Sequence, residues 1–355
     1  MSVGYRLIAL NELDAALVEA WRSIQRVEER LESPYFCPEF TRLVGSVRDD
    51  VRIVVIENDG RPVGFFPHQR APWGRGKPVG GPLSDYHGVI AAPGSDWSVS
   101  ELMRAAKLSV WTFDHLADAS GKFAPYVTAH ATSPQIDLSR GMEAYLKELG
   151  GPPSEFTRKA RKMAREVGAL SFTLHEADGG PMERLLGWKS EQFRRSSLAN
   201  AFDVRWTIEL LRRVMEVQTP EFAGVCSVLR AGDQVVAVHA GMRSRRVLHW
   251  WFPTYDQEFA KYSPGIILLM RIAEAVAAAG TRLIDLGKGD ARYKSSFMTG
   301  AAELREGFVE LPSLFGTARR LRRAAEARAA AGGLAATLRL PLRAIRRLER
   351  VRRFH

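Results

Sequence analysis

Apolar and polar positions alternate in blocks between residues 246 and 300, and the order of these blocks predicts a strand, a helix and a second strand. The apolar run Val247–Trp251 predicts the first strand. Residues 266–279 are apolar on nearly every face, which predicts a buried helix with Ser263 at its N-cap and Pro264 at its first position. A short apolar run over residues 281–286 predicts the second strand.

The start of this predicted helix and the polar loops beside it are candidate ligand positions. A helix N-terminus presents unpaired N–H groups and a partial positive charge, and both suit a phosphate. Gly265 would let a ligand approach the backbone closely. Lysines supply positive charge nearby, at Lys261, Lys288 and Lys294. A plain capped core helix with solvated lysines explains the same residues, so the local sequence leaves both interpretations open.

Two strand–turn–strand patterns, one in each half of the chain, predict a repeated α/β unit. The first pattern covers residues 51–56 and 62–67 around a turn with Gly60, and the second covers residues 225–229 and 235–243. Predicted helices precede both patterns. We therefore expect an α/β fold with mixed sheets, made of two tandem units.

Charge separates the end of the chain from the rest. The 355 residues are 46% hydrophobic and 26% charged, which is ordinary for a globular protein. The net charge is +11, and residues 316–355 hold twelve arginines against two glutamates, so most of it lies there. We expect domains at residues 1–139 and 140–315, followed by a basic helical tail at residues 316–355.

The tail has the pattern of an amphipathic helix after Pro341, with arginines around an apolar face. Such a helix can lie on an anionic membrane surface. Nucleic acid is disfavoured because Phe354 is the only aromatic residue among the arginines, and stacking on bases requires more of them. A groove on a partner protein and a solvated tail are the other interpretations.

Two further polar groups are candidate substrate contacts. Arg158, Arg161 and Lys162 share one face of a predicted helix with Arg165, and such a face can neutralise phosphates, although a solvated helix face is equally consistent. The triplet Asp85-Tyr86-His87 ends a loop rich in glycine and proline and could line an acceptor site, or Asp85 could cap the turn.

A motif in the same stretch resembles a known family. It consists of Tyr262-Ser263-Pro264-Gly265 and Asp285-x-Gly287-x-Gly289-Asp290-x-x-Tyr293-Lys294. This pattern resembles the CelD-like, cellulose-biosynthesis-type branch of the GNAT acyltransferases, which is similar to the FemAB-type transferases, and the resemblance covers roughly residues 20 to 312. It implies an acyl-CoA donor, such as acetyl-CoA, with its pyrophosphate on the helix start near Gly265. The commoner GNAT loop before the helix is reduced here to Lys261 and Gly265.

Acyl transfer from a thioester requires a base for the nucleophile and N–H donors for the developing oxyanion, and a proton for the thiolate assists it. His239, on a predicted central strand, is the candidate base, although a single histidine on an apolar strand is often a core residue. Asp285 or Asp290 could assist it, and Tyr293 or Tyr255 could protonate the thiolate. No metal-binding motif is present, and we expect no metal.

The expected roles follow from the motif and from these chemical requirements. The candidate catalytic residues are His239, Asp285 and Tyr293. The candidate donor-binding residues are Lys261, Tyr262, Ser263, Pro264 and Gly265. The candidate substrate-binding residues are Asp85, Tyr86, Arg158, Arg161, Lys162, Tyr255, Lys288, Asp290 and Lys294.

We expect an N-acyltransferase that acts on an amino sugar, a sugar nucleotide or a polysaccharide precursor in envelope or exopolysaccharide synthesis, an acceptor class that rests on the resemblance. The start of the chain has no signal pattern and no apolar run is long enough to span a membrane, so we expect a cytoplasmic protein, with the inner membrane as a surface for its tail. A FemAB-type transferase using charged tRNA is one alternative, although no inserted helical arm is evident between residues 170 and 300. A non-catalytic component of a polysaccharide-synthesis assembly is the other.

Overall fold

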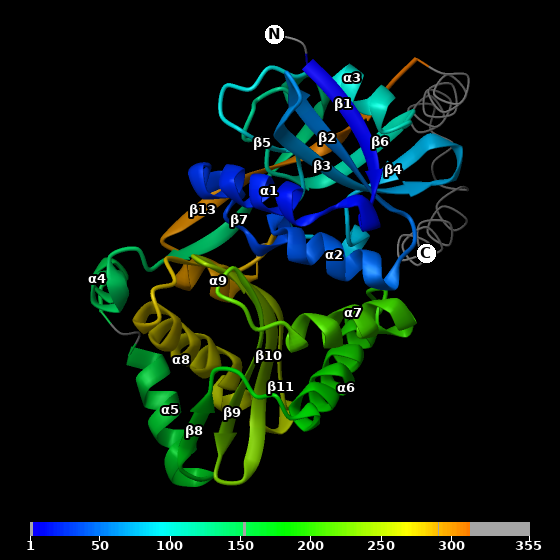
Figure 1. Cartoon of the computed structure of the whole chain (residues 1–355). Helices are drawn as coiled ribbons and strands as arrows, with labels where there is room; N and C mark the ends of the chain where they lie inside the picture. The colour runs from blue at the N-terminus through cyan, green and yellow to red at the C-terminus, as the bar shows by residue number, and fades with distance from the viewer. Residues whose placement is uncertain (1–2, 152–153, 290, 313–355) are drawn as a thin grey trace, which may run out of the picture. The chain divides into compact units, whose positions relative to one another are not determined.

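The computed structural model describes residues 3–151, 154–289 and 291–312 (Figure 1). The predicted basic tail at residues 316–355 and the candidate substrate residue Asp290 lie outside the described residues. Within the described ranges, no helix combines the length and the apolar character that crossing a membrane requires.

The chain divides into two compact units, each built from more than one segment. Unit 1 holds the chain up to Leu31, Val44–His130 and the described residues from Arg305 onward. Unit 2 holds Glu32–Leu43 and Ala131–Leu304.

The sheet of unit 1 has the strand order β1-β2-β3-β4-β6-β13, with the two-residue strand β5 paired to β3. The pair β4–β6 is parallel and the other neighbours along this order are antiparallel. The strands are β1 (Val3–Ala9), β2 (Val51–Asn58), β3 (Arg61–Ala71), β4 (Arg75–Lys77), β5 (Ile90–Ala91), β6 (Val110–Leu116) and β13 (Gly300–Glu310). The hairpin β2–β3 turns at Asp59 and Gly60, whose φ angles of 48° and 77° suit a tight two-residue turn.

The sheet of unit 2 has the strand order β8-β9-β10-β11-β12-β7. Here the pair β11–β12 is parallel and the other neighbours are antiparallel. The strands are β7 (Val127–Asp137), β8 (Leu170–Thr173), β9 (Phe222–Ala231), β10 (Gln234–Ser244), β11 (Val247–Tyr255) and β12 (Leu283–Asp285).

The two sheets therefore repeat one topology, and the predicted tandem α/β arrangement is confirmed. The last strand of each sheet comes from the other half of the chain. Strand β7 follows β6 in sequence but pairs with β12, whereas β13 follows β12 and pairs with β6. As a result, residues 131–139 group with unit 2 and the described residues from Arg305 onward group with unit 1, across the predicted limits at 139 and 315.

Helices cover these sheets, and in each unit one of them connects the two parallel strands: α3 in unit 1 and α8 in unit 2. The helices are α1 (Ala15–Val27), α2 (Pro38–Val47), α3 (Val99–Ala105), α4 (Gly141–Glu148), α5 (Ser154–Glu166), α6 (Gly179–Arg195), α7 (Arg205–Glu216), α8 (Pro264–Ala278) and α9 (Arg292–Phe297).

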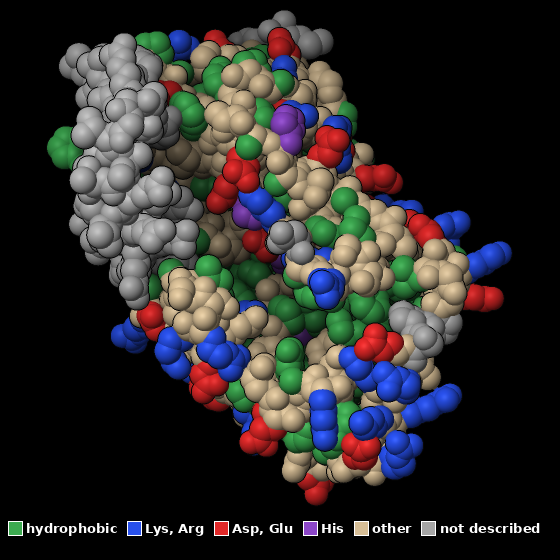
Figure 2. Space-filling model, turned by 180° about the vertical axis from the view of Figure 1, so that it is seen from behind, with side chains coloured by type: hydrophobic (Ala, Val, Ile, Leu, Met, Phe, Trp, Pro, Cys, Tyr) green, Lys and Arg blue, Asp and Glu red, His purple; other side chains and the backbone are tan. Residues whose placement is uncertain are grey.

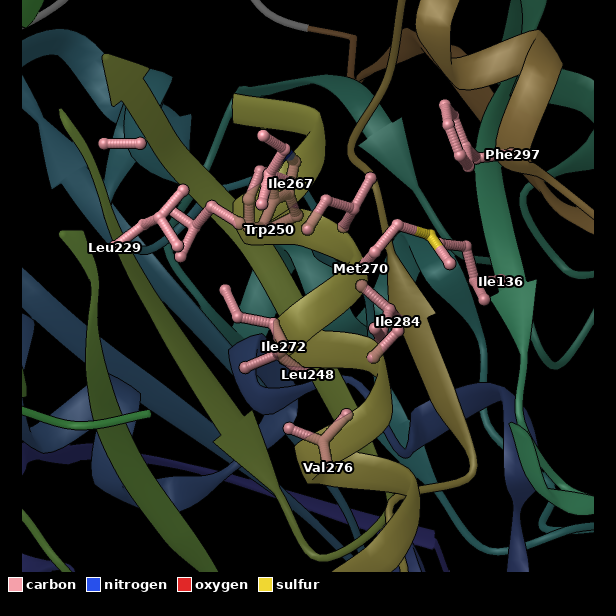
Figure 3. Packing of buried hydrophobic residues seen from close by; sticks show 14 of the residues in the cluster. Ile136, Leu229, Leu248, Trp250, Ile267, Met270, Ile272, Val276, Ile284 and Phe297 are labelled. Atoms are coloured by element: carbon pink, nitrogen blue, oxygen red, sulfur yellow. The ribbon is translucent and has the colours of Figure 1, made fainter. Parts of the chain in front are cut away.

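Helix α8 is the centre of the core of unit 2. Its side chains pack against β11 and β12, as Figure 3 shows for Ile267, Trp250 and Ile284. The predicted buried helix is confirmed, and Gly280 ends it with a φ of 86°. Full burial of one such aliphatic side chain stabilises the fold by about 1.5–3 kcal/mol, so this layer holds the helix start in a fixed place against the sheet.

Candidate active site

Strands β11 and β12 pair only over a short length, which leaves one edge of β11 open. The paired residues run from Val247 to His249 on β11 and from Leu283 to Asp285 on β12. Beyond His249, no described strand pairs with β11 on that side. A β-bulge lies at the same point, because three steps along β11 match two steps along β10. Bulges of this kind bend a strand and re-aim its side chains.

The open part of β11 leads to the start of α8 through a short 3-10 helix, η8 (Gln257–Tyr262). Tyr255, predicted in a polar loop, is instead the last residue of β11, and a Cβ atom added to Gly265 would lie 3.3 Å from its ring. The candidate donor-binding position Gly265 therefore lies next to the end of the strand.

Ser263 is the N-cap residue of α8, as predicted, but its side chain makes no capping hydrogen bond. Its φ of 54° is left-handed, and its hydroxyl accepts a hydrogen bond from the Lys159 Nζ at 2.9 Å. Its carbonyl accepts from the N–H groups of Ile266 and Ile267. Pro264 has no N–H, so Gly265 supplies the first N–H of the helix. Helix geometry gives this N–H no intrahelical partner.

Helix α5 lies beside this helix start and brings cations to it. In addition to the bond from Lys159, the hydroxyl of Tyr262 donates to Glu166 Oε2 at 2.8 Å, so the buried Tyr262 joins η8 to α5. The side chains of Arg158 and Arg161 are exposed and that of Lys162 is half-buried. Figure 2 shows Lys and Arg side chains gathered on the part of unit 2 that includes α5.

Pro264 and Lys261 are the remaining two donor-binding candidates. Pro264 is buried at the first position of α8. The Nζ of Lys261 lies 4.8 Å from the ring centre of Tyr262. Neither contact tests the predicted binding role, which stays a prediction for both residues.

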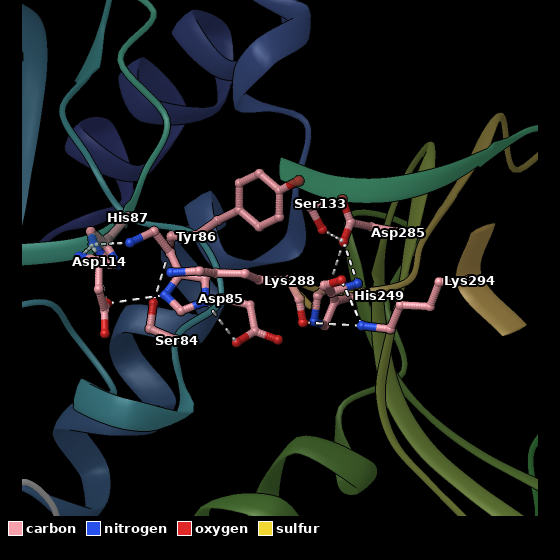
Figure 4. Close-up of polar contacts among 12 residues, drawn as sticks. Ser84, Asp85, Tyr86, His87, Asp114, Ser133, His249, Asp285, Lys288 and Lys294 are labelled. Carbon is pink, nitrogen blue, oxygen red and sulfur yellow. Dashed lines mark hydrogen bonds and ion pairs between the residues drawn. The ribbon is translucent and has the colours of Figure 1, made fainter. Parts of the chain in front are cut away.

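Asp285 is the acceptor at the centre of a buried polar cluster (Figure 4). It is 1% exposed and accepts from the Ser133 hydroxyl at 2.6 Å, the Gln135 amide at 3.0 Å and the Gly287 N–H at 2.8 Å. The Nδ1 of His249 lies 3.4 Å from its Oδ1. The catalytic role of Asp285 stays a prediction, and its contacts fit a group that orders the site.

The glycine loop after β12 is fixed by a buried lysine. The Nζ of Lys294 donates to the carbonyls of Gly287 and Lys288, at 2.8 and 3.1 Å (Figure 4). Lys294 is 8% exposed, so it is not one of the solvated lysines of the alternative interpretation. Lys288 is half-buried, and binding of an anion by either lysine stays a prediction.

His239, the candidate base, is fully buried and stacks on Trp250, with ring centres 4.2 Å apart. Its ring nitrogens lack a well-formed hydrogen bond among the described residues, and a contact with the main chain of His249 acts to raise its pKa. Burial lowers the pKa of His239 to about 3, and the neighbouring His249 adds to the lowering. Gly241 makes room for this ring, because a Cβ there would lie 2.5 Å from it. A base with so low a pKa is weak near neutral pH.

Tyr293, on α9, packs against the core of unit 2. Burial raises the pKa of its hydroxyl, whereas the indole of Trp250 acts in the opposite direction. The raised pKa keeps the phenol protonated at neutral pH, as a proton donor for a thiolate must be.

Lys189 is a residue that the sequence reasoning missed. Its Nζ reaches from α6 to the carbonyl of Pro253 on β11, at 3.1 Å. Burial lowers its pKa to about 8, and the charge of Lys294 acts in the same direction. Ser133, Gln135 and His249 were missed as well, because no local pattern marks residues that meet only when β7, β11 and β12 pair.

The other two substrate candidates, Asp85 and Tyr86, belong to unit 1. Tyr86 is 5% exposed, and Asp85 Oδ1 lies 3.8 Å from His115 Nε2. His115 Nδ1 in turn lies 3.0 Å from Asp114 Oδ1. Acceptor binding by Asp85 and Tyr86 stays a prediction.

Comparisons with known proteins agree with the geometry of unit 2. Residues 154–295 match the family model described as an acetyltransferase (GNAT) domain. No curated protein matches the sequence. The second unit therefore carries a GNAT acetyltransferase domain, and the enzyme class of the chain is N-acyltransferase.

Solved structures share the fold at low sequence identity. One is the C-terminal DUF2156 domain of a protein named as a lysylphosphatidylglycerol synthetase, from Agrobacterium fabrum, with 12% identity and a TM-score of 0.51 over 86% of this chain and 94% of that chain. Another is a tandem GNAT protein from the clavulanic acid biosynthesis pathway, with 13% identity and a TM-score of 0.51 over 88% and 100%. FemX matches with 9% identity and a TM-score of 0.50 over 73% and 87%. These similarities show the GNAT fold, while the CelD-like branch stays a prediction.

Proposed function

We propose that this protein transfers an acyl group from an acyl-CoA, such as acetyl-CoA, to the amino group of an amino sugar, a sugar nucleotide or a polysaccharide precursor. The observation that carries the proposal is the open edge of β11 leading directly to the start of α8. The acceptor class rests on the resemblance of the motif between residues 262 and 294.

The donor fits this arrangement chemically. The pantetheine arm of coenzyme A is extended and carries two amides, which can pair with the unpaired peptide groups of a strand edge. The diphosphate would then lie where Gly265 gives close access to the start of α8. Lys159, beside Ser263, brings a cation to that end, and Glu155 pairs with it at 2.8 Å on the exposed side of α5.

The exposed cations of α5 support a phosphorylated substrate. Arg158 and Arg161 extend from the helix that carries Lys159. Arginine binds phosphate oxygens with two parallel N–H groups, so these side chains suit the phosphates of coenzyme A or of a sugar nucleotide.

The FemAB-type resemblance of the motif gives a second donor class, aminoacyl-tRNA, as the alternative to acyl-CoA. A projecting helical arm would favour that donor. Between residues 170 and 300, apart from the undescribed position 290, the two long helices before β9 pack on the sheet: α6 against β10 and β11, and α7 against β9. This packing favours the smaller acyl-CoA donor.

Replacement of Gly265 tests the donor site. Gly265→Glu places a carboxylate where the diphosphate would bind, whereas Gly265→Gln adds nearly the same volume without the charge. We expect Gly265→Glu to weaken acetyl-CoA binding by at least about 100-fold, measured by calorimetry, because like charges repel in a partly buried site. Gly265→Gln should weaken it less. Equal affinity of Gly265→Glu and the wild type would exclude this helix start as the donor site.

A further inference from the structure

Lys189 is a half-buried cation without a carboxylate beside it. Its Nζ donates to the Pro253 carbonyl at 3.1 Å and lies 5.6 Å from the ring centre of Phe193, on its own helix. Among the residues that the structure describes, no acidic side chain forms an ion pair with it. Burying a charged amine without a counter-ion is costly, so a purely structural lysine at this place would be a poor choice.

The Nζ of Lys189 lies at the open edge of β11. The N–H of Asp256 donates to Val236 on β10, and in an antiparallel pair the main-chain groups of successive residues point to opposite edges. The main-chain groups of Asp256 and Thr254 therefore point toward β10, and the main-chain carbonyl of Pro253 points away from it. The carbonyl that Lys189 binds is thus on the edge where the donor would lie.

Other titratable groups surround the amine from the neighbouring elements. Lys294 on α9 lowers its pKa, and Lys189 in turn lowers the pKa of His239 on β10. His249 on β11 also acts on His239. Burial and the charge of Lys294 therefore oppose the charged form of Lys189, and the amine is neutral in part of the molecules near pH 8.

We propose that the neutral amine of Lys189 is the base that takes a proton from the acceptor amine as it attacks the thioester. The inference rests on the proposed function and adds a catalytic residue to it. The bond to the Pro253 carbonyl uses one N–H and would leave the nitrogen lone pair to accept the proton.

The step balances with the groups present. The acceptor nitrogen bonds to the thioester carbonyl carbon, and the carbon–sulfur bond breaks. One proton of the acceptor nitrogen moves to Lys189 Nζ, and the coenzyme A thiolate takes a proton from solvent. Lys189 returns its proton to solvent when the products leave, so the products are an amide and free coenzyme A.

The other candidates suit the role of base less well. His239 has a pKa of about 3, so it binds a proton only weakly near neutral pH. The carboxylate of Asp285 already accepts hydrogen bonds from Ser133, Gln135 and Gly287. The raised pKa of Tyr293 suits a donor rather than an acceptor of protons.

The test follows coenzyme A release from acetyl-CoA between pH 6 and 10, with glucosamine as the acceptor and with water alone. The wild type should gain activity as the pH rises through about 8, because Lys189 loses its proton there. Lys189→Arg and Lys189→Met should lower kcat about 10²–10⁴-fold and lose this rise, since neither can act as a base. Acetyl-CoA affinity should stay near the wild-type value in both.

Controls separate catalysis from structure. Lys189→Arg keeps a charged donor for the Pro253 carbonyl, so a structural role predicts activity close to the wild type. Lys147→Arg, at an exposed position on α4, should leave the pH profile unchanged. A Lys189→Arg protein that keeps both its activity and the rise near pH 8 overturns the inference.

A second measurement does not depend on turnover. Competitive labelling with acetic anhydride at increasing pH, read by mass spectrometry, reports the pKa of Lys189 itself. A value near the ordinary 10.5 overturns the inference even if the acceptor is wrong. Failure of the wild type to bind acetyl-CoA would instead overturn the proposed function, and this inference with it.

Discussion

The two units share one strand order but differ at the strand before the connecting helix. In unit 1 this strand is β4, which has three residues, two of them paired with its parallel partner β6. In unit 2 it is β11, which has nine residues and extends well beyond its partner β12. The same topology therefore offers a long open edge in unit 2 and none of comparable length in unit 1.

The connecting helices differ in the same direction. Helix α3 of unit 1 has seven residues and an acid, Glu101, in its first turn. The N–H of Ser98, at its N-cap, donates to the hydroxyl of Tyr5. Helix α8 has fifteen residues and no acid in its first turn. An anion is repelled at the first helix start and attracted at the second, which supports the proposed donor site in unit 2.

The largest expected effects come from replacing the buried carboxylate near the end of β12 in unit 2 or of its equivalent β6 in unit 1. Asp285→Ala removes the acceptor for Ser133, Gln135 and Gly287, and we expect the free energy of unfolding to fall by about 2–4 kcal/mol because buried donors lose their partner. Chemical denaturation measures this change, and activity should fall as well because the site loses its order.

Asp118 of unit 1 is the matched control. It accepts from Arg305 at 2.7 Å and from the N–H of Phe123, so Asp118→Ala should cost a similar stability. Transferase activity should stay within about threefold of the wild type at a temperature where the variant is folded. Equal loss of activity in the two variants would contradict the assignment of the chemistry to unit 2.

A smaller effect is expected from pH, and it is common to both units. Burial lowers the pKa of His68 in unit 1 to about 4 and that of His239 in unit 2 to about 3. The folded states resist protonation that the unfolded chain accepts below about 6.5. Each histidine thus stabilises the fold above pH 6.5, and this stability is lost as the pH falls toward the folded pKa.

Between pH 6.5 and 5 the expected loss is about 1–2 kcal/mol for each histidine. Denaturation curves of His68→Leu and His239→Leu should show a shallower dependence on pH, whatever their absolute stability. An unchanged slope in either variant would show that its histidine has the same pKa in the folded protein as in the unfolded chain.

The smallest effect is expected at the start of α3. Glu101→Gln removes the acid that distinguishes this helix start from that of α8. Because the donor is assigned to unit 2, acetyl-CoA affinity should change by less than about twofold, with one molecule bound per chain in calorimetry. A second bound molecule in this variant would show that only the acid separates the two units as donor sites.

The sequence alone determined the features that depend on neighbouring residues. Turn residues between apolar runs predicted both hairpins, and Pro264 and Gly280 marked the ends of α8, because turn geometry and helix ends are set by local backbone preferences. The motif around Gly265 and Tyr293 identified the GNAT domain. Ser263 stands at the predicted N-cap, but its hydroxyl accepts from Lys159 and makes no capping hydrogen bond, and this tertiary contact is not predictable from neighbouring residues.

Only the tertiary structure decided which residues meet. The exchange of β7 and β13 between the units, the bulge in β11 and the cluster around Asp285 join residues that are far apart in sequence. Lys189 is the clearest example, since its neighbours in sequence are those of an ordinary helix and only burial against β11 makes its amine a base. Burial and charge interactions depend on distance in space, and no local pattern of residues encodes them.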